Sequence, residues 1–233
     1  MIKEGILKGA ERKEPNWKKT KLGEPFKEAL DKFREDVLGR DDFDSTALLQ
    51  FGLFMSMAVI NMLKENEATF GIEGQKAVNR ALIKTGYNVG KEIVENAEIP
   101  ASISPIELMS FIATIINTQA WTSIEDPTID SEDQCSFNIL WCPLQNVYRA
   151  FDCRVQRYLV QGIIEAFREK TPFNNDYQIE FTQTIPAGKD FCRFVINEKK
   201  PGEPDKWETY SKLLERKAMA RLEERKKEEK NSS

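Results

Sequence analysis

The stretch from Gly71 to Glu95 constrains the fold more than any other part of the chain. Small and apolar residues recur there at every third or fourth position, which is the repeat of one helical face. The stretch therefore predicts a long helix that packs along one side. Gly74, Gly86 and Gly90 lie on that face, and each costs roughly 1 kcal/mol of helix propensity against alanine. We expect these glycines to permit close packing of another element; the alternative is a surface that makes room for a ligand.

Similar spacing predicts helices on both sides of this segment. Helices are expected over residues 26–38, 46–66, 105–117 and 155–167. Pro105 suits the first position of its helix. A last helix follows Gly202, where Asp205 and Glu208 resemble a capping box.

The longest uncharged stretch runs from Ser45 to Leu63. It contains the polar residues Gln50, Ser56 and Asn61, and it is barely long enough to cross a bilayer. We interpret it as a buried helix, with a membrane-embedded segment as the alternative.

Four strands are expected in the second half of the chain. Residues 119–124 and 134–142 have strand character and are joined by the acidic segment 125–133, which reads as a turn. Residues 177–185 and 190–196 predict a hairpin around Pro186–Lys189. Sequential strands favour antiparallel pairing. The fold class is therefore α+β, with an antiparallel sheet of about four to five strands, a helical N-terminal half and a charged C-terminal helix.

Three regions are predicted from changes in composition. Residues 1–25 form a polar N-terminal arm, residues 26–197 a single α+β domain, and residues 198–233 a linker with the charged C-terminal helix. Beyond Leu222 that helix holds almost only Arg, Lys and Glu. It is either a solvated end or a contact for another chain, in a partner protein or a homo-oligomer.

Charge and composition restrict the partners. The chain has 34 basic and 38 acidic residues among 233, with a net charge of −4, so nucleic acid is not an expected partner. The N-terminal sequence lacks the apolar core of a secretory signal, so we expect a cytoplasmic protein with reduced thiols and no membrane partner.

The chain contains no histidine. This excludes Ser-His-Asp and Cys-His catalysis and every metal site that needs imidazole. Any catalysis must use carboxylates, thiols, lysine, tyrosine or backbone dipoles. No cofactor and no metal are predicted.

The four cysteines do not form one site. In the strand 135–142, alternation places Cys135 on one face and Cys142 on the other. A metal site built from Cys142, Cys153 and Cys192 with a carboxylate such as Asp152 remains an alternative, although no CxxC pair is present. The simplest interpretation of each cysteine is a small buried hydrophobic residue.

Charged residues surround Cys192. Asp190 is expected to share a strand face with Cys192, where its carboxylate is placed to relay a proton. Lys189 and Arg193 supply positive charge for a substrate carboxylate. The alternative is a hairpin tip with solvated charges.

Several segments together resemble a known family. They are GIEGQKAV from Gly71, GYNVG from Gly86, the strand end Cys142-Pro143, and TIPAGKDFCRF from Thr184. The pattern resembles the L-2-amino-thiazoline-4-carboxylic acid hydrolase family, over roughly residues 45–197. The small-molecule-binding domains of the vinyl-reductase type have a similar layout.

The resemblance implies an α+β fold and hydrolytic opening of a small cyclic amidine. It also implies that Cys142, Cys192 and Asp190 are catalytic. Arg193 and Lys189, by their positive charge, are the expected substrate-binding residues. Cys142 would be the nucleophile or an orienting group, and Cys192 its partner.

One departure from the family pattern favours a second function. Family members tend to carry a further cysteine, followed closely by aspartate, in the long helix between these two cysteines. Residues 158–167 contain neither. The alternative function is a non-catalytic, small-ligand-binding module of the vinyl-reductase type, or an accessory subunit of a partner enzyme.

Overall fold

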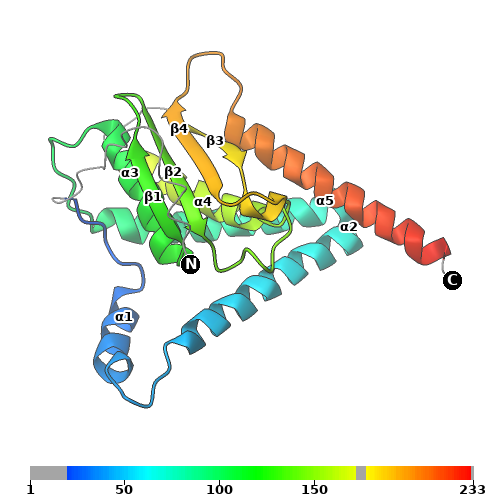
Figure 1. Cartoon of the computed structure of the whole chain (residues 1–233), viewed down its shortest axis with the longest axis horizontal. Coiled ribbons are helices and arrows are strands. Elements are labelled where there is room, and N and C mark those ends of the chain that lie inside the picture. Colours follow the sequence, from blue (N-terminus) through cyan, green and yellow to red (C-terminus); the bar gives the residue numbers. More distant parts are fainter. Residues whose placement is uncertain (1–19, 172–176, 232–233) are drawn as a thin grey trace. The chain divides into compact units, whose positions relative to one another are not determined.

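The computed structural model describes residues 20–171 and 177–231 (Figure 1). Within these residues the chain forms two compact units. We call residues 99–150 and 177–212 the sheet unit, and residues 21–98, 151–171 and 213–231 the helical unit. Each unit is built from separate stretches of sequence, and each is described by itself.

The sheet unit contains a four-stranded antiparallel sheet with strand order β1-β2-β4-β3. Its strands are β1 (Ile124–Ile129), β2 (Gln134–Trp141), β3 (Tyr177–Gln183) and β4 (Cys192–Glu198). The predicted α+β class, with helices flanking an antiparallel sheet, is confirmed. The predicted boundaries at residues 26 and 197 stay a prediction.

The first predicted strand is wrong in position. Residues 119–124 were expected to be extended, but a π-helical turn (η2, Ile116–Ala120) continues the preceding helix. The strand is instead β1, which occupies much of the segment expected to be a turn. Pro127 is tolerated because β1 lies at the edge of the sheet, where one side of the strand needs no partner. Pairing with β2 along its whole length outweighs the poor strand propensity of Asp126 and Pro127.

Helix α3 (Pro105–Ile115) packs against β1 and β2. Ser104 caps it in a full capping box with Glu107, and Pro105 occupies its first turn as predicted. The buried face of α3 supplies apolar side chains to the core of the unit: Ile106, Leu108, Phe111 and Ile112.

Helix α5 (Lys206–Asn231) begins in the sheet unit. Asp205 accepts a hydrogen bond from the N–H of Glu208 at 2.9 Å, which is one half of the predicted capping box. In this unit the ring of Phe181 contacts Trp207 and Tyr210. An aromatic cluster therefore joins the start of α5 to β3.

The helical unit is organised around α2 (Thr46–Glu95) and α4 (Arg154–Lys170). It also contains α1 (Lys27–Phe33), which continues as the π-helical turn η1 (Arg34–Leu38). Gly71 interrupts α2 with φ 61° and ψ −138°, a conformation open mainly to glycine. The two helices predicted before and after residue 71 therefore both form, joined by a kink.

Close packing explains the glycines of the periodic segment. A Cβ added at Gly86 would lie 1.9 Å from the carbonyl oxygen of Leu159, and one at Gly90 would lie 2.8 Å from the Cα of Ile163. On α4, a Cβ at Gly162 would lie 2.0 Å from the carbonyl oxygen of Ile83. The backbones of α2 and α4 thus touch where glycines face them, and the close-packing interpretation is confirmed for Gly86 and Gly90. A Cβ at Gly74 would instead lie 2.1 Å from the carbonyl oxygen of Asn66, in the same helix before the kink.

The first half of α2 differs from the expectation. The uncharged stretch is helical, but most of it is exposed rather than buried; only Ile60 and Leu63 within it reach the core. By length and hydropathy α2 is also sufficient to cross a membrane. The prediction that residues 45–63 form a buried helix is therefore wrong. Composition identifies a segment as apolar but does not show which surface, if any, packs against it.

Candidate functional site

The structure brings Cys142 and Cys192 together in the sheet unit. Cys142 directly follows β2, and Cys192 begins β4, which pairs with β2. The two sulfurs are close enough for a charge on Cys142 to raise the pKa of Cys192. Cys135 lies farther along β2, opposite Ile196. Cys153 belongs to the helical unit, as the residue before α4.

Polar groups surround the sulfur of Cys142. The Ser123 side chain and the backbone N–H groups of Leu144 and Gln145 hydrogen-bond it. Burial raises the pKa of the Cys142 thiol, and these hydrogen bonds oppose the rise. The turn after β2 therefore offers converging donors that stabilise negative charge on this sulfur or on an atom bound beside it.

Cys192 is a buried, neutral thiol. Burial raises its pKa to about 11, against the hydrogen bond that the N–H of Ile185 donates to its sulfur at 3.2 Å. At neutral pH it is a proton donor rather than a thiolate. Both members of the pair are therefore protonated thiols. The groups that can stabilise an anion are the donors around the Cys142 sulfur.

Three charged residues were predicted around the thiol of Cys192. Lys189 and Asp190 are exposed in the turn that precedes β4. Arg193 follows Cys192 along β4, and its guanidinium donates to Asn138 Oδ1 at 3.1 Å and to Ser136 Oγ at 3.3 Å. Because neighbouring strand residues face opposite ways, Arg193 lies on the other face of the sheet from Cys192. Their predicted roles stay predictions.

Glu125 is a candidate residue that the sequence analysis missed. Its Oε1 accepts a hydrogen bond from Thr114 Oγ1 at 2.9 Å, while its Oε2 is buried without a hydrogen-bond partner. Burial raises the pKa of Glu125 to about 7, although Thr114 and Asn117 hydrogen-bond it. A carboxyl group with a pKa near neutrality is suited to general acid–base chemistry, which a chain without histidine otherwise lacks.

Strand pairing relates Glu125 to Cys192. Glu125 on β1 is opposite Ile139 on β2, and Ile139 is opposite Cys192 on β4. The three side chains share one face of the sheet, with Glu125 and Cys192 two strand spacings, or roughly 10 Å, apart. Ile139 lies between them. The acidic segment was interpreted as a turn, so this alternation was not visible from the sequence.

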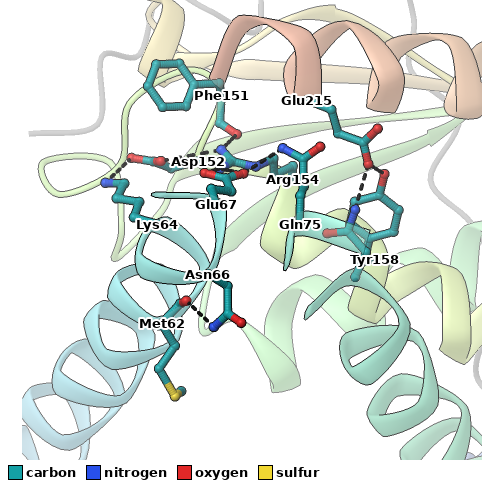
Figure 2. Close-up of polar contacts among 11 residues, drawn as sticks. Met62, Lys64, Asn66, Glu67, Gln75, Phe151, Asp152, Arg154, Tyr158 and Glu215 are labelled. Atoms are coloured by element: carbon teal, nitrogen blue, oxygen red, sulfur yellow. Dashed lines mark hydrogen bonds and ion pairs between the residues drawn. The ribbon is translucent and has the colours of Figure 1, made fainter. Parts of the chain in front are cut away.

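A second polar cluster lies inside the helical unit (Figure 2). Arg154 Nη2 donates to both carboxylate oxygens of Glu67, at 2.7 and 2.9 Å, and Gln75 Nε2 donates to Glu67 Oε1 at 2.6 Å. Arg154 Nη1 donates to the carbonyl oxygen of Phe151 at 2.8 Å. Asp152 lies 3.5 Å from Lys64 Nζ and 3.7 Å from Arg154 Nη1.

This cluster connects the two halves of α2. Glu67 precedes the kink at Gly71 and Gln75 follows it, and both are fully or almost fully buried. Nearby, Tyr158 and Asn79 both donate to Glu215. The hydrogen bonds of Glu67 to Gln75 and Arg154 join residues on both sides of the kink and on α4, which indicates that the cluster holds the kink and the helices in place.

Metal ligation finds no support in the described ranges, residues 20–171 and 177–231. There, no group of three cysteine or carboxylate side chains is arranged to hold a metal ion.

Comparisons with known proteins place the chain in a family. An uncharacterized protein of Archaeoglobus fulgidus is 46% identical over 199 residues, which cover 84% of this chain and 88% of the relative. A crystal structure of trafficking protein particle complex subunit 3 from Naegleria fowleri, covalently bound to palmitic acid, aligns with a TM-score of 0.40 and 14% identity. That alignment covers 62% of this chain and 96% of the other.

The family model for L-2-amino-thiazoline-4-carboxylic acid hydrolase matches residues 52–196. This range includes both cysteines of the pair and Glu125. The match covers more than half of the chain and agrees with the resemblance found in the sequence. The chain belongs to the L-2-amino-thiazoline-4-carboxylic acid hydrolase family.

Proposed function

We propose that the protein is a hydrolase that opens a small cyclic amidine, such as a 2-amino-thiazoline carboxylate, by cleaving a ring C–N bond. The observation that carries this proposal is the pairing of Cys142 with Cys192 beside converging hydrogen-bond donors. Membership of the hydrolase family supports the same class of reaction.

The reaction balances with water alone. The oxygen of water bonds to the amidine carbon, and the bond from that carbon to the ring nitrogen breaks. The departing nitrogen takes both protons of the water and leaves as an amine, and the carbon keeps the oxygen as a carbonyl. Negative charge that develops on the way needs nearby donors, and the N–H groups of Leu144 and Gln145 and the Ser123 side chain are such donors.

The residues have separate roles in this proposal. Cys142 orients or attacks the amidine carbon, and Cys192, a neutral thiol, supplies a hydrogen bond or a proton. Two carboxylates are candidates for the proton carrier: Asp190, which is exposed, and Glu125, whose pKa of about 7 lets it both give and take a proton near neutrality. Lys189 or Arg193 anchors the substrate carboxylate.

Serine substitutions test the proposal. Cys142→Ser and Cys192→Ser should each abolish turnover of 2-amino-thiazoline-4-carboxylate by the purified chain, measured as appearance of the ring-opened product. Cys135→Ser is the matched control, because Cys135 is a buried cysteine on the same strand but outside the pair, and it should keep activity. Full turnover in both pair variants would refute the roles given to these thiols.

A second candidate function has its own support. Burial raises the pKa of both thiols, which makes them poor nucleophiles, and residues 158–167 lack the helix cysteine that the family resemblance leads us to expect. Both observations favour a module that binds a small ligand, or an accessory subunit that docks on a partner enzyme. Binding of the thiazoline by calorimetry, with no product formed and both serine variants still binding, would select this function.

The site also bears on where the protein works. Catalysis by the pair needs reduced thiols, so we propose a reducing, cytoplasmic setting. The four cysteines of the structure are all free, which is compatible with that setting.

A further inference from the structure

Ser123 lies against the sulfur of Cys142 and is held there by its own backbone. Its side chain hydrogen-bonds the Cys142 sulfur, and its N–H donates to the carbonyl oxygen of Asn117 at 3.0 Å. Asn117 is tied to α3 in turn, because its Nδ2 donates to the carbonyl oxygen of Ala113 at 2.8 Å. Ser123 is also buried. The end of α3 therefore fixes this residue on one side, and the thiol contacts it on the other.

The backbone around Ser123 departs from regular structure at three places. Helix α3 ends in the π-helical turn η2, and Thr122 has φ 54°, which a β-branched residue rarely adopts. The pairing of β1 with β2 then shifts register between Ile124 and Glu125. A register shift re-aims the side chains beside it, and strained backbone gathers at functional sites. These departures give Ser123 a direction that a regular strand would not give it.

The turn that follows β2 fixes Cys142 from the other side. The N–H of Cys142 donates to Gln145 Oε1 at 3.3 Å, and the N–H of Gln145 donates to the Cys142 carbonyl oxygen at 3.1 Å. Pro143 occupies the second position of this four-residue turn, where its fixed φ is favourable. The N–H groups of Leu144 and Gln145 also hydrogen-bond the sulfur. Every polar group of Cys142 therefore has a partner within the sheet unit.

The partners of the Cys142 sulfur favour its ionised form. A backbone N–H can only donate, so the N–H groups of Leu144 and Gln145 suit a thiolate better than a thiol. The hydroxyl of Ser123 can rotate, so it accepts from a thiol and donates to a thiolate. Ser123 therefore contacts the sulfur in both states, and it stabilises the negative charge once the proton has left.

The Cys192 sulfur has weaker support for a negative charge. The N–H of Ile185 donates to it at 3.2 Å. Burial is the main cause that raises the pKa of Cys192 to about 11, and a negative charge on Cys142 contributes to the rise. The first ionisation of the pair therefore belongs to Cys142, and the charge that it creates opposes the second.

We propose that Ser123 is the positioning residue that makes Cys142, rather than Cys192, the reactive thiol of the pair. This rests on the function proposed for the site, in which Cys142 either attacks or orients the substrate, and it selects attack. Ser123 acts through the sulfur. Its hydroxyl holds the thiolate in the direction set by the two turns, and it lowers the pH at which the thiolate forms.

Alkylation by iodoacetamide tests the proposal on the full chain without a substrate. The sulfur displaces iodide, a carbon–sulfur bond forms, and the thiol proton passes to the buffer, so the rate follows the thiolate fraction. Mass spectrometry of the cysteine peptides gives the rate for each thiol between about pH 7 and pH 10. Exposure scales a rate equally at every pH, whereas the pH at which the rate rises reports ionisation. The rise for Cys142 should come at lower pH than the rise for Cys192.

Removal of the hydroxyl isolates the role of Ser123. Ser123→Ala should move the rise of the Cys142 rate up by about one pH unit and slow alkylation near pH 8 by roughly three- to tenfold. Ser131→Ala is the matched control, because Ser131 is an exposed serine in the turn after β1 whose hydroxyl contacts Asp133. It should leave the profile unchanged. Circular dichroism checks that both variants fold.

Two results would overturn the proposal. One is a Cys142 profile that is the same in Ser123→Ala as in the unchanged protein. The other is a Cys192 rate that rises at lower pH than the Cys142 rate, which needs only the unchanged protein and so decides even if Ser123→Ala does not fold. Failure of the proposed function looks different: the unchanged chain would not turn over 2-amino-thiazoline-4-carboxylate, while the alkylation profiles would still be as expected.

Discussion

Arg154 shows how the helical unit handles a buried charge. Its side chain is fully buried, and Glu67, which it contacts through two hydrogen bonds, is 4% exposed as a residue. A buried ion pair adds little net stability, because both charges lose their hydration. Removing one partner is costly, however, because the other charge is left alone in the interior.

The first prediction follows from this asymmetry. Arg154→Met should lower the free energy of unfolding by about 3–5 kcal/mol, since Glu67 loses its countercharge. The double variant Glu67→Met with Arg154→Met should be much closer to the unchanged protein, because two apolar side chains replace the pair. Urea unfolding of both single variants and the double variant measures the coupling. If Arg154→Met lowers the free energy of unfolding equally in the unchanged protein and in the Glu67→Met variant, the two side chains are not coupled.

Glu125 makes stability depend on pH. Its pKa is about 7 in the folded protein and near its ordinary value of 4.5 in the unfolded chain, so the folded state binds the proton more tightly. The stabilisation is complete below pH 4.5 and is lost as the pH rises through 7. Between about pH 5 and pH 8 the free energy of unfolding should therefore fall by roughly 2 kcal/mol on account of Glu125.

The second prediction isolates this contribution. Glu125→Gln should remove that fall, so that the variant gains stability over the unchanged protein as the pH rises. The measurement is urea unfolding at about pH 5 and pH 8. Glu132→Gln, in the exposed turn after β1, is the control and should leave the pH dependence unchanged. A similar fall in the Glu125→Gln variant would show that another group titrates.

At the scale of elements, the contact of α2 with α4 has no room for a methyl group. A Cβ at Gly86 meets backbone atoms of α4, which cannot rotate away as a side chain can. The helices would have to separate, and the interlocking contact of Gly162 with Ile83 would be disturbed as well.

The third prediction uses that contact. Gly86→Ala should destabilise the protein by about 1–3 kcal/mol or more, although alanine is the better helix former. Asn88→Ala, at an exposed position two residues on, should be neutral or slightly stabilising for the same propensity reason. Thermal unfolding followed by circular dichroism compares the two. A stabilised Gly86→Ala variant would mean that the helices are not in contact there.

Elements were predictable where one local rule dominated. Periodicity identified α2, α3 and α4, and the Ser104–Pro105 start of α3 carried its own capping signal. β1 was not predictable, because Asp126 and Pro127 disfavour a strand unless a neighbouring strand pairs with them. The exposure of the first half of α2 was also missed, since an apolar sequence does not state which surface covers it.

At the scale of the whole molecule, the polar contacts depended on distant pairings. Glu67 and Arg154 are 87 residues apart, and Tyr158 and Glu215 are 57 apart, so no local pattern relates them. The pairing of Cys142 with Cys192 followed from the family resemblance rather than from spacing. Glu125 was missed because its role depends on strand register, which the sequence did not show.

The two units are interleaved along the chain. The sheet unit takes residues 99–150 and 177–212, and the helical unit takes the stretches before, between and after them. Neither unit is a continuous piece of sequence, so neither can be isolated by trimming the ends. The family match from residue 52 to residue 196 accordingly includes parts of both.

The position of β1 at the edge of the sheet affects whether strands of other molecules can pair with it. An outer strand with free N–H and C=O groups is a template on which further strands can add, which is the route to amyloid fibres. Pro127 offers no N–H to such a strand, and β1 is only six residues long. This border of the sheet is therefore protected against strand-by-strand polymerisation.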